Sequence, residues 1–168
     1  FGESNFGRII DKGETERGFS LLINGYGADI GYLTYGGTYV SSNNDVINLN
    51  TWTHVCVVYD ESQQIVTFYI NGQEAGSSSY TNSPADTLND PLYIGLRGYD
   101  GQRNFDGQID GVCLYNRSLD SDEIQQVYAA GKEGSLIGQW SLDDHTGTEA
   151  ADSSGYGYNA TLINSPEW

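Results

Sequence analysis

Basic residues are scarce in this sequence. Only 7 lysines and arginines stand against 23 aspartates and glutamates, which gives a formal net charge of -16. A surface of this charge repels nucleic-acid phosphates and anionic lipid headgroups. We therefore expect no nucleic-acid partner and no binding to a membrane surface.

Long apolar runs are also missing. The uninterrupted ones are short, and Phe1 leads directly into polar sequence. Neither a membrane-spanning helix nor a signal peptide fits this pattern, so we expect that any export signal was removed or lies upstream. We expect no direct insertion into a membrane.

Charged residues make up only 18% of the 168-residue chain, so much of its polarity comes from other residue types. Glycine occurs 22 times and tyrosine 13 times, beside many serines, threonines and asparagines. This composition is typical of a turn-rich β protein. The length corresponds to one domain that can bury a substantial core.

Apolar and polar residues alternate over short segments that are bounded by Gly, Asn, Asp or Ser. The spacing predicts strands over 7–10, 19–24, 30–35, 52–59, 65–70, 92–96 and 109–115. Within 66–73, Asn71-Gly72 predicts a hairpin, because both residue types reach the positive φ of a type I′ turn at low cost. These signals favour a β-sandwich or barrel.

One stretch, at about 120–130, has a helical pattern instead. Asp120 or Ser121 can cap its first turn, and Glu123 suits the positive end of the helix dipole. Ile124, Val127 and Tyr128 form an apolar stripe. We expect a short helix that lies on the sandwich.

The segments 52–60, 68–72 and 91–95 are followed by Phe105-Asp106-Gly107-Gln108-Ile109-Asp110-Gly111 and then by the helix. This ordered series resembles the laminin G-like, concanavalin A-like jelly rolls of the lectin and glucanase superfamily, over most of residues 7–130. The resemblance implies an all-β fold: a two-sheet antiparallel jelly-roll sandwich with one short helix. It also implies that Trp52 and Trp140 belong to the core.

The segment 134–168 resembles the start of such a module but stands at the end of this sequence. We therefore divide the chain into 1–133, the main part of a jelly roll, and 134–168. The second part is either a permuted completion of the same sandwich or the beginning of a next repeat. Because some family strands have no counterpart here, we expect neighbouring modules or protein subunits to complete the sandwich.

Catalysis is not expected from the carboxylates of this chain. Related glucanases carry Glu-x-Asp-x-Glu on one strand face, and nothing here matches that pattern. The nearest cluster, Asp106 with Asp110, is better explained by a turn, a cap or a metal ligand. We expect a protein that is not an enzyme.

Calcium is the metal that the resemblance implies. Ca²⁺ takes several oxygen ligands, and in the resembling family an aspartate of the terminal strand meets the opening segment around such an ion. Carried over to this sequence, the ligands are Asp110, Asp143 and Asp152. The alternative is that these aspartates are turn and surface residues.

Aromatic side chains beside amide and charged groups are the usual means of binding a glycan, because sugars stack C–H faces on rings while their hydroxyls need polar partners. The ligand-binding candidates are of this kind: Tyr32, Tyr35, Tyr39, Asn43, Tyr99 and Arg103. Each tyrosine also has a structural interpretation, since tyrosine commonly packs on one side of a sandwich and reaches water on the other.

Cys56 and Cys113 are the two cysteines of the chain. They stand at strand positions where the resembling family usually has other residues. In an extracellular chain they form a possible disulfide. Two buried thiols that pack as small apolar side chains are the alternative.

Together these observations predict a secreted or cell-surface binding or adhesion module without catalytic activity. The expected partner is a polysaccharide or glycoconjugate, and the expected cofactor is structural calcium. The alternative is a structural or assembly component of a larger cell-surface protein or complex, with no glycan ligand. This functional part depends on analogy of fold.

Overall fold

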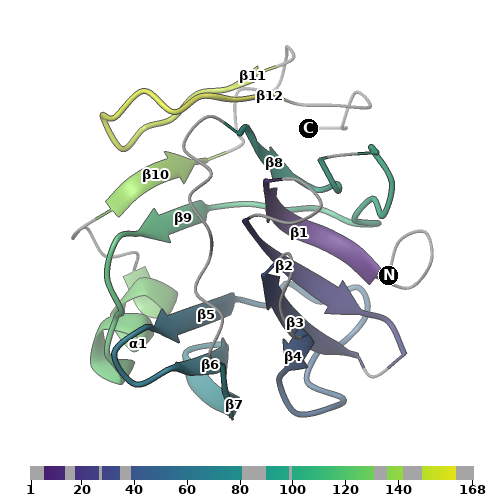
Figure 1. Cartoon of the computed structure of the whole chain (residues 1–168), viewed down its shortest axis with the longest axis vertical. Helices are drawn as coiled ribbons and strands as arrows, with labels where there is room; N and C mark the ends of the chain where they lie inside the picture. The colour runs from purple at the N-terminus through teal and green to yellow at the C-terminus, as the bar shows by residue number, and fades with distance from the viewer. Residues whose placement is uncertain are drawn as a thin grey trace.

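The computed structural model describes residues 6–13, 18–26, 28–34, 39–80, 90–98, 100–130, 136–141 and 149–161. Over these ranges the chain forms antiparallel β-sheets with a short helix beside them (Figure 1). This confirms the predicted fold class.

The first layer is a five-stranded sheet with the order β4-β3-β2-β1-β8. Its strands are β1 (Phe6–Lys12), β2 (Phe19–Asn24), β3 (Asp29–Thr34), β4 (Tyr39–Ser41) and β8 (Leu92–Ile94). Alternate residues of these strands face the core, among them Ile10, Ile23 and Ile30. Their neighbours in sequence form the opposite, outer face of the sheet.

The second layer holds β5 (Val55–Asp60), β6 (Ile65–Ile70) and β7 (Gln73–Ser79), paired in that order. The turn between β6 and β7 is the predicted one, with φ of 50° at Asn71 and 77° at Gly72. A second pair, β9 (Val112–Tyr115) with β10 (Leu136–Trp140), lies on the other side of β5 in Figure 1.

Helix α1 spans Ser121–Ala130, as the sequence predicted. Asp120 caps it, because its Oδ1 accepts the backbone N–H of Glu123 at 2.8 Å while Glu123 Oε2 accepts the N–H of Asp120 at 3.1 Å. Ile124 is fully buried against the layer of β5 and β9, where Val58 and Tyr115 pack around it. The helix therefore covers the outside of the second layer.

The C-terminal segment shares the core of the sandwich. Trp140 of β10 lies in one hydrophobic cluster with Phe68 of β6 and Ile30 of β3. Ala150 and Ala160 belong to the same cluster; they lie in the short paired strands β11 (Glu149–Ala150) and β12 (Ala160–Thr161). Trp140, Ala150 and Ala160 therefore pack in the same core as the strands of the main part of the chain.

Trp52 corrects one expectation, because 66% of its surface is exposed. The strand predicted over 52–59 begins only at Val55, so Trp52 lies in the preceding loop rather than in the sheet. Trp140, 2% exposed, is in the core as expected. Among the described residues, no helix has the length and apolar character needed to cross a membrane.

Candidate functional site

Arg8 and Asp11 of β1 both point to the outer face of the five-stranded sheet. Residues three apart in a regular strand face opposite sides. Here the register against β2 shifts between Arg8 and Ile10, so Ile9 is an extra residue in β1. The bulge turns both charged side chains to the same face, and Arg8 Nε lies 3.4 Å from Asp11 Oδ1.

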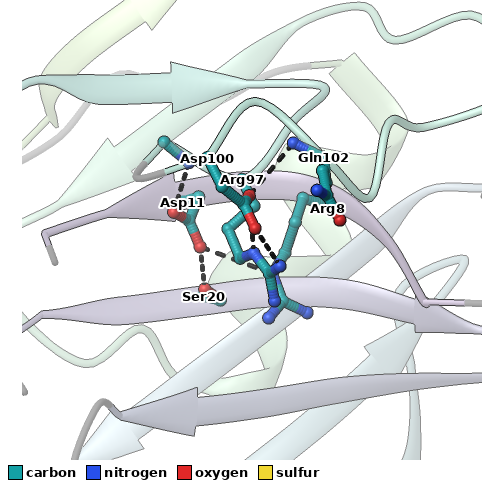
Figure 2. Close-up of polar contacts among 7 residues, drawn as sticks. Arg8, Asp11, Ser20, Arg97, Asp100 and Gln102 are labelled. Atoms are coloured by element: carbon teal, nitrogen blue, oxygen red, sulfur yellow. Dashed lines mark hydrogen bonds and ion pairs between the residues drawn. The ribbon is translucent and has the colours of Figure 1, made fainter. Parts of the chain in front are cut away.

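Further hydrogen bonds hold the Asp11 carboxylate (Figure 2). Ser20 Oγ, on the neighbouring strand β2, donates to Asp11 Oδ1. The backbone N–H of Gly98 donates to Asp11 Oδ2 at 2.9 Å. Asp11 and Ser20 are fully buried and Arg8 is 4% exposed. The Asp11 carboxylate thus faces the buried Arg8 guanidinium and joins β1 to β2 and to the loop after β8.

The loop after β8 is anchored to the same region. Arg97 pairs with Asp100, and Asp100 Oδ1 also accepts the backbone N–H of Gln102 at 3.0 Å. The backbone N–H of Arg8 donates to the carbonyl of Arg103 at 2.9 Å. Figure 2 shows Arg97, Asp100 and Gln102 beside Arg8 and Asp11. The loop thus lies along β1 and carries Arg103 to the outer face.

Asp29 is a second buried carboxylate on this face, only 3% exposed. It accepts hydrogen bonds from Asn24 Nδ2 and from Tyr39 Oη, each at 3.3 Å. Burial raises the pKa of Asp29, and the two hydrogen bonds oppose that rise. Burial, together with the nearby Asp29 charge, raises the pKa of Tyr39 to about 12. The Tyr39 hydroxyl therefore stays protonated and remains a donor.

The ring of Tyr39 lies across Gly31 of the neighbouring strand. A Cβ added to Gly31 would overlap this ring, so only glycine lets the ring lie so close to the sheet. Tyr39 nevertheless remains 39% exposed. The result is an aromatic side chain that rests on the sheet and is accessible from solvent.

A second aromatic group lies at the start of β1. Phe6 is opposite Asn24 in the register, and its ring meets that of Tyr26 edge-on at 6.0 Å between centroids. The guanidinium of Arg103 lies 5.4 Å from the Phe6 ring centroid. Tyr26 is 77% exposed. We call Phe6, Asn24, Tyr26, Asp29, Tyr39 and Arg103 the outer-face site.

The structure places the predicted ligand-binding residues in different parts of the molecule. Tyr39 and Arg103 belong to the outer-face site. Tyr32 lies on the core side of β3, 6% exposed and packed against Tyr59 and Tyr80, so it is a core residue. Asn43 is exposed at the edge where its backbone N–H donates to the carbonyl of Ala75 in β7. Tyr35 and Tyr99 lie outside the described residues.

Sequence reasoning did not select Phe6, Asn24 and Asp29 of the site, nor the supporting pair of Arg8 and Asp11. One signal was available: β1 reads Phe-Gly-Arg-Ile-Ile-Asp-Lys, so Arg8 and Asp11 carry opposite charges on either side of two isoleucines, before the final lysine. Their spacing of three residues hid the relationship, since strand periodicity alone places them on opposite faces.

Two of the three predicted calcium ligands, Asp110 and Asp152, lie among the described residues. Asp152 Oδ1 accepts the N–H groups of Gln139 and Ser154, and its Oδ2 accepts that of Tyr158, all at 2.9 Å. Asp110 is exposed, and Asp143 lies outside the described residues. Within the described part of the chain, no three His, Cys, Asp or Glu side chains form a group that could hold a metal. In the described part of the chain, Asp152 organises a loop through these hydrogen bonds.

Cys56 and Cys113 are both free in the structure, each half-buried. Cys56 lies on β5 beneath α1, and burial raises its pKa to about 11. Burial also raises the pKa of Cys113. Of the two alternatives, the structure has the packed thiols rather than the disulfide.

The family model described as the concanavalin A-like lectin/glucanases superfamily matches residues 2–125. The chain belongs to this family, which confirms the resemblance seen in the sequence. No curated protein matches the chain.

Solved structures show the same fold. A candidate carbohydrate-binding protein from Bacteroides ovatus has a TM-score of 0.75 at 20% identity, over 95% of this chain and 50% of that one. The chain thus spans about half the length of that protein. A heptameric SAP-like pentraxin from Limulus polyphemus has a TM-score of 0.63 at 17% identity, with 95% and 77% covered.

The IT-sialidase CBM40 of Ruminococcus gnavus has a TM-score of 0.61 at 15% identity, with 76% of this chain and 78% of that chain covered. Its complex with alpha2,3 sialyllactose has a TM-score of 0.57 at the same identity and coverage. At these identities the likeness shows the fold of this chain.

Proposed function

We propose that this chain is a non-catalytic, secreted or cell-surface carbohydrate-binding module, and that the outer-face site binds the sugar. One observation carries the proposal: Tyr39 and Tyr26 present exposed rings on the same sheet face as the polar groups of Asn24 and Asp29. Family membership and the carbohydrate-binding structures of the same fold support it.

The chemistry of the outer-face site suits a pyranose. The exposed ring of Tyr39 offers an apolar face for the C–H side of a sugar, and the amide of Asn24 and the guanidinium of Arg103 can bond its hydroxyls. A sugar bound over the Tyr39 ring would contact the ring with its C–H face and form hydrogen bonds to Asn24 and Arg103 with its hydroxyls.

The site is held rigid before any ligand arrives. Asp29 orients both Asn24 and Tyr39, and the buried pair of Arg8 and Asp11 fixes the strand that carries Phe6. Groups that are already ordered lose little conformational entropy on binding. This is the property expected of a face that recognises a ligand.

Affinity electrophoresis against a panel of soluble polysaccharides tests the proposal. Tyr39→Ala should weaken retention by the binding polysaccharide roughly 2- to 10-fold, the effect of losing one aromatic contact. Tyr128→Ala is the matched control, because Tyr128 is a half-exposed tyrosine on α1. If the wild-type chain binds no polysaccharide on the panel, the assembly role without a glycan ligand replaces this proposal.

Calcium remains a prediction of the family resemblance, and no part of the sugar contact depends on it. Melting curves with and without excess chelator test the predicted ion. A lower melting temperature that added calcium restores would support it. Unchanged melting would leave Asp152 with its role in the loop alone.

A further inference from the structure

Two tyrosines lie side by side on the loop between β11 and β12. The ring centroids of Tyr156 and Tyr158 are 6.4 Å apart and the ring planes are nearly parallel, at 14°. The two residues are 63% and 61% exposed. Most of this aromatic surface is therefore available to a binding partner. We call Tyr156 and Tyr158 the tyrosine pair.

The loop that carries the tyrosine pair is fixed by hydrogen bonds. Asp152 accepts the backbone N–H groups of Ser154 and Tyr158 within the loop and that of Gln139 in β10. The buried Trp140 donates from Nε1 to the carbonyl of Tyr158 at 2.8 Å. Both ends of the loop are thus tied to the core strand β10.

Glycines on either side of Tyr156 set the direction of the two rings. Gly155 and Gly157 have φ of 91° and 77°, a conformation that residues with a side chain rarely adopt. No heavy atom lies within 4 Å of where a Cβ would be at either position. The backbone conformation, rather than crowding, accounts for glycine here.

A fixed loop with two exposed rings is suited to binding. Exposed tyrosines give large, stiff contact surfaces at a low entropy cost. The other polar groups of the loop are engaged within the protein: Ser153 Oγ donates to the carbonyl of Gln139, Asn159 Oδ1 accepts the N–H of Asp152, and the Asp152 carboxylate accepts three N–H groups. What the loop offers a ligand is therefore two exposed, uncharged rings with phenol hydroxyls, which match a neutral sugar. The net charge of -16 disfavours an acidic one.

The tyrosine pair is remote from the outer-face site. In Figure 1 the β11 and β12 segment is at the top of the molecule, whereas β3 and β4, which carry Asp29 and Tyr39, are at the bottom. A short sugar cannot contact both places. A long polysaccharide with a repeated unit can contact both places. Such a polymer binds more tightly through the two linked contacts than through either contact alone.

We infer that the tyrosine pair is a second carbohydrate contact, and that the ligand of this chain is a neutral polysaccharide long enough to engage both sites. The inference rests on the proposed function. The ring faces of Tyr156 and Tyr158 bind sugar units of the same polymer that occupies the outer-face site.

The test compares polymer with short oligosaccharide. The probes are mixed-linkage β-glucan, xylan and galactomannan, each beside a short oligosaccharide of the same repeat, in affinity electrophoresis and calorimetry. The double substitution Tyr156→Ala/Tyr158→Ala should weaken polymer binding at least about fivefold while changing oligosaccharide binding at the sheet less than about twofold. Tyr156→Phe/Tyr158→Phe should retain polymer binding, and Tyr128→Ala is again the control. Because both rings are exposed, the melting temperature of each variant should match that of the wild type.

Unchanged polymer affinity in the double alanine variant would overturn the inference while the proposed function stands. If the double variant loses polymer binding but Tyr39→Ala changes nothing, the tyrosine pair is a sugar site and the outer-face site is wrong. If the wild-type chain binds none of the three polymers, the inference fails.

Discussion

Arg8 and Asp11 form a buried ion pair although they are three residues apart in a β-strand. The bulge at Ile9 makes this possible by turning both side chains to the outer face of the sheet. Their position links three parts of the sequence, because Asp11 also bonds Ser20 of β2 and Gly98 of the loop after β8. The pair therefore supports β1, the strand that carries Phe6 of the outer-face site.

Removing one partner of this pair should be costly. Asp11→Ala leaves the Arg8 guanidinium buried without its carboxylate, and we expect a loss of about 3 kcal/mol or more in the free energy of unfolding. Denaturant titration measures it. Arg117→Ala, which breaks a pair with Glu123 at the surface, is the control and should cost much less. Equal losses in the two variants would contradict the structural role given to Asp11.

Gly31→Ala tests the position of the Tyr39 ring without removing any side chain of the outer-face site. The added methyl group would overlap the ring and push it off the sheet. We expect weaker binding of the polysaccharide that the wild type retains, close to the effect of Tyr39→Ala. Full affinity in Gly31→Ala, measured on folded protein, would show that the ring position does not matter.

The loop that carries Tyr156 and Tyr158 should lose stability at low pH. Burial opposes ionisation of Asp152, but the hydrogen bonds from Ser154, Gln139 and Tyr158 outweigh it and lower the pKa from 3.8 to about 2. The unfolded chain therefore binds the proton first as the pH falls, and the stability that Asp152 contributes is complete above about pH 4 and is lost toward pH 2. Melting temperatures across this range should fall less steeply in Asp152→Asn than in the wild type. Parallel curves would contradict this role.

Thiol reactivity distinguishes two free cysteines, Cys56 and Cys113, from a disulfide between them. Burial raises the pKa of both thiols, so few thiolates exist near pH 8 and the native protein should react slowly with a disulfide reagent. Denaturation without a reductant should then release two reactive thiols. Finding none would establish a disulfide and refute the free cysteines of the structure.

The sequence predicted the features that depend on local pattern. The period-two alternation located most strands, Asn71-Gly72 located the β6–β7 turn, and Asp120 with Glu123 located the start of α1. It missed β7, because Gln73–Ser79 is rich in serine and has little apolar alternation. This strand forms because β6 supplies its partner.

The site was harder to predict, because the face to which a side chain points depends on register. Tyr32 and Tyr39 are the same residue type in neighbouring strands, yet one packs in the core and the other lies on the outer face. The bulge at Ile9 changes the face of the sheet to which part of β1 points its side chains. The sequence around Ile9 carries no local signal for this bulge. The exposure of Trp52 likewise depends on where β5 begins.

The central claim is that the outer face of the five-stranded sheet binds carbohydrate. The most direct test is an NMR titration of the ¹⁵N-labelled chain with a short oligosaccharide of the polysaccharide that it retains. The account predicts saturable shifts of the backbone amides of Asn24, Tyr26 and Tyr39, with those of α1 unchanged. Saturable shifts confined to other surfaces, or no saturable shift at all, would contradict it.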